Sequence, residues 1–220
     1  PPGLVLEAAV VAAPKDARIS RATLGRLVER APMPVEPWPE TTRVRFVDLL
    51  LCGHDAIGVI EALDHSGLWE RYLPEWAGVR NRPQRNAYHR FTVDRHLLDT
   101  CANAAALTHK VARPDLLLFG ALLHDIGKGR PGDHTEVGMA LMEEIGPRLG
   151  YDAEDTAVLI DLIRHHLLLP DVAVRRDLSD DATIAAVADA VGDRGRLELL
   201  AALTEADSLA TGPAAWGGWK

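Results

Sequence analysis

The stretch Leu116-Leu117-Leu118-Phe119-Gly120-Ala121-Leu122-Leu123-His124-Asp125-Ile126-Gly127-Lys128-Gly129 decides the fold. Its first eight residues are apolar or glycine on every side, so a helix formed by them must be buried all round. The run is too short to span a bilayer. It ends in an imidazole and a carboxylate, and a carboxylate that is buried without a partner is costly. We therefore expect a fixed cation beside Asp125, and a metal ion is the simplest candidate.

The composition is that of an ordinary soluble globular protein, with 47% hydrophobic and 25% charged residues in 220. A net charge of -8 argues against tight, sequence-blind binding to nucleic acid or to an anionic membrane. The two cysteines, Cys52 and Cys101, form no disulfide framework, which predicts reduced core residues in a cytoplasmic protein. No signal peptide or membrane span is apparent. The absent initiator Met and the abrupt end predict a piece of a longer chain.

The pattern along the chain predicts an all-α protein, because apolar residues recur at helical spacing and no alternating strand pattern of useful length occurs. Four prolines within residues 31–42 exclude helix there. We therefore expect an N-terminal helical and proline-rich arm over residues 1–43 and one domain over residues 44–220. Helices are expected over the ranges 15–30, 44–51, 56–66, 92–111, 116–125, 135–149, 152–166, 181–191 and 194–209.

Several histidines and aspartates fall at helix ends or on apolar helix faces. They are His96, His124, Asp125, His134, His165, His166 and Asp207. Asp207 continues the apolar stripe of Leu200 and Leu203, where a carboxylate is an error, a buried ion-pair member or a metal ligand. A lone histidine on a helix is more often a hydrogen-bonded core or surface residue than a ligand. A purely structural role explains one such residue well but does not explain so many at these positions together. We therefore expect a metal site, with Asp125 able to bridge two ions.

The loop over residues 78–88 carries Arg80, Arg82 and Arg85. It is either a solvated basic loop or a rim that meets an anionic substrate. His89 lies close in sequence to His96 and could also touch substrate.

His96, His124-Asp125 and Asp207 resemble the H…HD…D pattern of the HD-domain phosphohydrolases. With His134 and His165-His166, the set resembles the members with a two-metal site, such as the HD-GYP phosphodiesterases. Longer segments are similar to the central region of the bacterial PII uridylyltransferase/uridylyl-removing enzymes, over roughly residues 45–220. These segments are the ranges 88–96, 124–129, 132–134 and 164–167, together with Trp216-x-x-Trp219-Lys220.

The resemblance implies an HD-type helical bundle that hydrolyses the phosphodiester between a PII tyrosine and UMP, or AMP as in some actinobacterial relatives. Asp125 would bridge two divalent ions; His96, His124 and Asp207 would complete one, and His134, His165 and His166 the other. Mn, Fe, Co or Zn would suit this nitrogen-rich set better than Mg. Lys128 would neutralise a phosphate oxygen, beside substrate contacts from His89 and Arg85. A nucleotidyltransferase domain and ACT domains would flank this region in the full-length chain.

Two other functions stay open. One is an HD phosphohydrolase acting on a free nucleotide or a cyclic dinucleotide, although the chain contains no Gly-Tyr-Pro. The other is a catalytically silent HD module that relays signals between flanking domains. The complete ligand set argues against the second, because a relay has no physical need for it.

Overall fold

The computed structural model describes residues 3–15, 17–84, 91–212 and 215. Over these residues the chain is helical and contains no strand, which confirms the all-α prediction. The α-helices are α1 (Leu4–Ala12), α2 (Arg21–Arg30), α3 (Glu40–Leu51), α4 (His54–His65), α5 (Val93–Leu107), α6 (Pro114–Leu123), α7 (His134–Arg148), α8 (Ala153–His165), α9 (Leu168–Arg175), α10 (Asp181–Val191) and α11 (Arg194–Thr211). Short 3₁₀ turns are η1 (Ala13–Lys15), η2 (Trp69–Arg71), η3 (Pro74–Gly78), η4 (Thr108–Lys110) and η5 (Ile126–Gly129).

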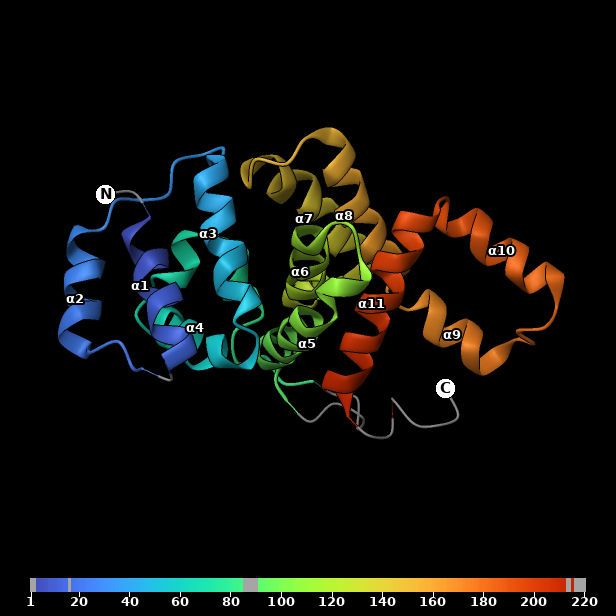
Figure 1. Ribbon diagram of the computed structural model, residues 1–220, viewed down its shortest axis with the longest axis horizontal. Helices are drawn as coiled ribbons and strands as arrows, with labels where there is room; N and C mark the ends of the chain where they lie inside the picture. Colours follow the sequence, from blue (N-terminus) through green and yellow to red (C-terminus); the bar gives the residue numbers. More distant parts are fainter. Residues whose placement is uncertain (1–2, 16, 85–90, 213–214, 216–220) are drawn as a thin grey trace.

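Helix α6 occupies the middle of the molecule (Figure 1). Every residue from Leu116 to Leu123 is buried, as its uniformly apolar sequence predicts. Helices α3, α5, α8 and α11 pack against it. Gly120 permits the close approach of α8, since a Cβ at that position would lie 2.7 Å from Leu162 Cδ1. The helix ends at Leu123, so that His124 and Asp125 lie in the turn between α6 and η5.

Aspartate side chains cap the first turns of four helices. Asp133 accepts from the backbone N–H groups of Thr135 and Glu136 at the start of α7. Asp152, Asp180 and Asp193 do the same for α8, α10 and α11. These caps satisfy backbone donors that the helix itself leaves open, which explains why the helix starts could be placed closely from the sequence.

Several helix boundaries differ from the expectation. The helix expected over residues 44–51 begins earlier, at Glu40, so the prediction that prolines exclude helix throughout residues 31–42 is wrong; Pro39 precedes the helix as its N-cap, where its missing N–H breaks no intrahelical hydrogen bond. The helix expected over residues 15–30 begins only at Arg21, where Ser20 caps it as predicted. The helix expected to reach residue 111 ends at Leu107 and continues as η4. Helix α9 was not predicted; it is short, buries none of its residues and contains Pro170. That proline lies in the first turn, where its missing N–H breaks no intrahelical hydrogen bond.

An aromatic group joins the N-terminal residues to α6. Phe46 of α3 stacks on Phe119 of α6 with ring centroids 5.3 Å apart, and Trp38 lies 5.1 Å from Phe46. The Trp38 ring is edge-on to Phe119 at 6.5 Å, and its backbone N–H donates to Arg148 O at 2.8 Å. Residues on both sides of position 43 therefore pack around Phe119 of α6. The division into residues 1–43 and 44–220 stays a prediction.

Helices α9 and α10 project from the bundle as an antiparallel pair, at the right of Figure 1. Within the described residues, no helix combines the length and apolar character needed to cross a membrane.

Candidate metal centre

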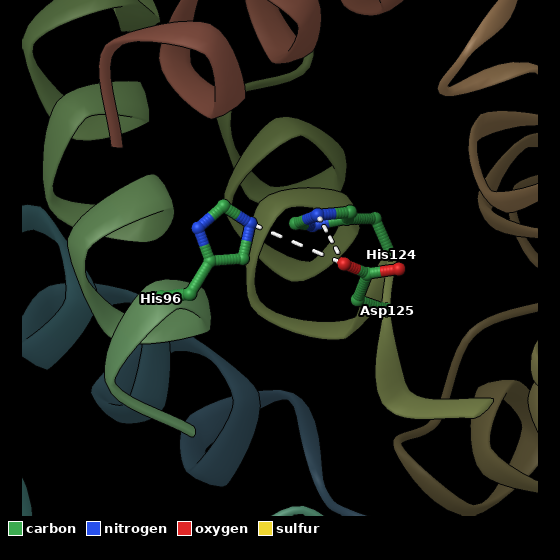
Figure 2. A group of neighbouring side chains, drawn as sticks. All are labelled: His96, His124 and Asp125. Carbon is green, nitrogen blue, oxygen red and sulfur yellow. Dashed lines mark ion pairs between the residues drawn. The ribbon is translucent and has the colours of Figure 1, made fainter. Parts of the chain in front are cut away.

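Three buried side chains from two elements converge at the end of α6. His96 projects from α5, and His124 and Asp125 project from the turn after Leu123 (Figure 2). Asp125 Oδ2 lies 3.5 Å from His124 Nε2 and 4.0 Å from His96 Nε2. The potential ligand atoms of the three residues all lie within 4.8 Å of one another, which is close enough to share one ion.

The other oxygen of Asp125 faces a second group. Asp125 Oδ1 lies 3.7 Å from Nε2 of His134, the first residue of α7, and 3.8 Å from Nε2 of His166, which follows α8. These ligand atoms also lie within 4.8 Å of one another. The two oxygens of one carboxylate therefore serve two histidine groups, which is the arrangement that a bridging ligand requires.

Asp207 of α11 adds a second carboxylate to the first group. Its Oδ1 lies 3.0 Å from His96 Nε2 and 3.8 Å from His124 Nε2. Burial by itself would raise the pKa of this carboxyl, but the hydrogen bond with His96 and the nearby His124 lower the pKa to about 2. Asp207 is therefore ionised throughout the physiological pH range and offers an anionic oxygen beside two imidazoles.

Backbone carbonyls fix two of the rings. His124 Nδ1 lies 2.9 Å from Ala121 O, and His166 Nδ1 lies 2.6 Å from Ile163 O. Because a carbonyl oxygen only accepts, the Nδ1 atom carries the hydrogen, and Nε2 is the ring atom that faces Asp125. Hydrogen bonds of this kind orient metal-binding histidines in many proteins. Burial lowers the pKa of His124, but the neighbouring Asp125 carboxylate outweighs this effect and raises that pKa.

The electrostatics of Asp125 fit a bound cation. Burial would raise the pKa of this carboxyl, but His124, Lys128 and His166 hold its pKa well below the usual range. Burial lowers the pKa of His166, and neighbouring His124 lowers it further, which favours the neutral, ligating form. Asp125 Oδ1 and His124 Nε2 are buried and have no hydrogen-bond partner among the described residues. Buried polar atoms without partners are costly, and a divalent ion would satisfy both.

Two glycines allow the turn after Asp125 to touch the start of α7. A Cβ on Gly127 would lie 1.9 Å from His134 O and 2.6 Å from Gly138 N. A Cβ on Gly138 would in turn lie 3.0 Å from Ile163 Cγ2 of α8. These close approaches hold Asp125, His134 and His166 together, since each residue lies beside one of the touching backbones.

An open cavity of about 750 Å³ leads to the centre. Its lining includes Asp125, His134, His166 and Asp207, with Lys128 and Arg82 as cationic residues. Lys128 Nζ lies 2.5 Å from Asp125 Oδ2. The arrangement places a positive side chain, two ionised carboxylates and several imidazoles at one opening, which suits a phosphate-containing ligand and divalent ions.

The structure brings together six of the seven predicted metal ligands and separates one. His165 does not join either group: with Asp161, Val191, Arg196 and others it lines a small hollow between α8 and α11. The two adjacent rings point in different directions, since His166 Nε2 faces Asp125 Oδ1 whereas His165 lines the separate hollow. We therefore leave His165 out of the ligand set.

The residues predicted to contact substrate have different outcomes. Arg85 and His89 lie outside the described residues, so their roles remain expectations. Arg80 pairs with Asp64 and Glu70 and has a structural role. Arg82 lines the cavity, as a rim residue would. Sequence reasoning gave no role to Gln84 and Leu167, which also line it; Leu167 lies in the segment 164–167 that carries the resemblance, whereas Gln84 lies in none of those segments.

Residues 93–192 match the family described as HD domain. The chain is 54% identical over 220 residues to a Streptomyces coelicolor protein and 50% identical over 220 residues to one from Mycobacterium tuberculosis H37Rv. A Corynebacterium glutamicum relative is 39% identical over 216 residues. All three are named bifunctional uridylyltransferase/uridylyl-removing enzyme. The matches cover 98–100% of this chain but only 26–31% of the relatives, so it spans between a quarter and a third of their length.

Proposed function

Residues 93–192 belong to the HD domain family, and from that premise we propose that this chain is a metal-dependent phosphodiesterase that removes UMP or AMP from a tyrosine of a PII signal protein. The observation that carries the proposal is the shared carboxylate of Asp125, with one oxygen toward His96 and His124 and the other toward His134 and His166. The names of the relatives support nucleotidyl removal as the reaction.

The proposed ligand set divides between two divalent ions. His96, His124, Asp125 and Asp207 would hold one ion, and Asp125, His134 and His166 the other. Ions bound there would supply Lewis acidity for hydrolysis of a phosphodiester. The nitrogen-rich donors favour Mn, Fe, Co or Zn over Mg.

The chain's own residues account for the rest of the reaction. Lys128 lies in the cavity next to Asp125 and would neutralise a phosphoryl oxygen of the substrate. A tyrosinate leaves with a pKa near 10, so the departing oxygen needs little help from a general acid. The open cavity supports a modified side chain on a protein surface as the substrate, since such a group enters from outside without the enclosure that a small free metabolite often receives.

The partners follow from the same proposal. Because the chain spans only part of its relatives, the PII substrate and the flanking nucleotidyltransferase and ACT domains are proposed for the full-length protein, which we expect to be cytoplasmic. We propose no nucleic-acid or membrane partner, in keeping with the net charge of -8.

The test is a hydrolysis assay with Mn²⁺ on uridylylated and adenylylated PII, with UTP, ATP and cyclic di-GMP as competing substrates. We expect release of UMP or AMP from PII, and loss of that release in Asp125→Ala. The matched control is Asp171→Ala, which removes an exposed carboxylate on α9. Preferential turnover of a free or cyclic nucleotide would replace the PII substrate in the proposal. No turnover of any of them would favour a silent relay module.

A further inference from the structure

Gln84 closely follows residues that contact the start of α5 and the turn η5 at three points. The backbone N–H of Val93 donates to Arg82 O at 2.8 Å, which ties Arg82 to the start of α5. Arg82 Nη1 donates to Gly129 O at 3.2 Å, which ties it to η5. Gly78, a few residues earlier, lies so close to Gly129 that a Cβ there would be 3.2 Å from Gly129 Cα. The side chain of Gln84 is therefore held beside the turn that carries Lys128.

The two side chains are in direct contact. Lys128 Nζ donates to Gln84 Oε1 at 3.2 Å while it also lies 2.5 Å from Asp125 Oδ2. An ammonium group can only donate, so the Gln84 atom that faces it is the carbonyl oxygen and the other atom is the amide nitrogen. That nitrogen is buried and finds no acceptor among the described residues. Gln84 lines the same cavity as Lys128 and Asp125.

We propose that Gln84 is a positioning residue for Lys128 and that its amide nitrogen and the ammonium group together form a subsite for a phosphate oxyanion. The inference deepens the proposed function, because it rests on Lys128 as the cation that meets the phosphoryl group. Gln84 Oε1 holds the ammonium on the cavity side, and Gln84 Nε2 supplies a second donor, which an incoming phosphate oxygen satisfies.

Lys128 needs a second acceptor because a divalent ion and the Lys128 ammonium would both bind the same oxygen of Asp125. Asp125 Oδ2 contacts Lys128 and also belongs to the His96, His124 and Asp125 group. A divalent ion held by that group repels the ammonium, since two cations then share one carboxylate oxygen. Gln84 Oε1 is the other acceptor that Lys128 contacts in the described part of the chain. It keeps the ammonium in the cavity when Asp125 serves an ion.

Gln84 is the only glutamine in the sequence, which allows a direct observation. Labelling with side-chain ¹⁵N-glutamine gives one amide pair in the NMR spectrum of the 220-residue chain. In the chain loaded with diamagnetic Zn²⁺, we expect inorganic phosphate to shift this pair, and Lys128→Met to shift it before phosphate is added. An amide pair that responds to neither phosphate nor Lys128→Met would overturn the proposal.

A double-mutant cycle separates positioning from an independent contact. Hydrogen bonds to charged groups contribute about 1.5–3 kcal/mol, so Gln84→Met should weaken phosphate binding by roughly tenfold or more. In the Lys128→Met background the Gln84 amide can still donate to phosphate but has no ammonium to position, so the same substitution should reduce the affinity clearly less than in the native background. Gln84→Glu keeps an acceptor for Lys128 but replaces the amide donor by a carboxylate that repels phosphate, so it should weaken phosphate binding at least as much as Gln84→Met. Equal losses in both backgrounds, or no loss in the native background, would contradict the positioning role.

The titration uses phosphate binding and no turnover, which keeps it separate from the test of the proposed function. A chain that binds phosphate through Gln84 but releases no nucleotide from PII would overturn the proposed function and leave this inference standing. The opposite result, hydrolysis with an unresponsive Gln84, would overturn only the inference.

Discussion

Replacing Gly127 by alanine should damage the metal centre much more than it damages the fold. The added Cβ would lie 1.9 Å from His134 O and 2.6 Å from Gly138 N. Both atoms belong to the backbone of the first five residues of α7, so no side-chain rotation can relieve the contact. Restoring an ordinary contact of 3.4 Å to His134 O requires η5 and the start of α7 to move apart by about 1.5 Å.

That displacement separates the two halves of the second ligand group. Asp125 and Lys128 lie on the η5 side, and His134 lies on the α7 side, where its Nε2 is now 3.7 Å from Asp125 Oδ1. A misplacement of about 1 Å can cost about 100-fold in rate, so we expect at least that loss of nucleotide release. Overpacking of this kind typically costs about 1–3 kcal/mol of unfolding free energy, which leaves a folded protein to assay.

The assay compares Gly127→Ala with the native chain in nucleotide release, bound Mn per chain and urea denaturation. Gly58→Ala is the matched control, because a Cβ at Gly58 within α4 would meet nothing within 4 Å. It should leave the activity unchanged and raise the unfolding free energy by about 0.5–1 kcal/mol. A Gly127→Ala protein with native metal content and a rate within twofold of native would refute the reasoning.

Three further predictions concern the ligands. His134→Ala should lower bound Mn from two ions per chain to one by elemental analysis, whereas His165→Ala should leave the metal content unchanged; equal losses in both variants would show that His165 is a ligand after all. Asp125→Ala should abolish nucleotide release and keep the helical circular dichroism, and more than a few per cent of native activity would make Asp125 structural. Asp207 has a folded pKa of about 2, below its ordinary value, so it should stabilise the metal-free fold above about pH 4 and lose that contribution as the pH falls through about 2. Asp207→Asn should flatten this acid limb of the unfolding free energy measured in urea, and an unchanged limb would exclude the His96 contact as its cause.

The fold could be predicted largely because its signals are local. The uniformly apolar run of α6 fixes the central helix, and aspartates such as Asp133 and Asp152 mark helix starts by satisfying free backbone N–H groups. Helix α9 has no such signal. It is only eight residues long, has no capping side chain and contains Pro170, so its apolar residues Leu168, Leu169 and Val172 did not by themselves predict a helix.

The candidate site could be predicted only where residue type and helix position coincide. The sequence itself shows three polar residues where apolar ones are expected, namely His124, Asp125 and Asp207. The choice between His165 and His166 depends on the rotation of α8 about its axis, which adjacent identical residues do not reveal. Gln84 could not be found, because its importance arises from a loop that returns to Lys128 after 44 residues of chain.

The aromatic packing of Trp38, Phe46 and Phe119 has a consequence for sequence variation among relatives. None of the three rings lines the cavity that leads to the metal centre, yet Phe119 is part of the helix whose end places His124 and Asp125. A smaller ring at one position would leave a void that only a larger neighbour can fill. Across relatives, the side-chain volumes at positions 38, 46 and 119 should therefore covary, so that their sum changes less than any one of them.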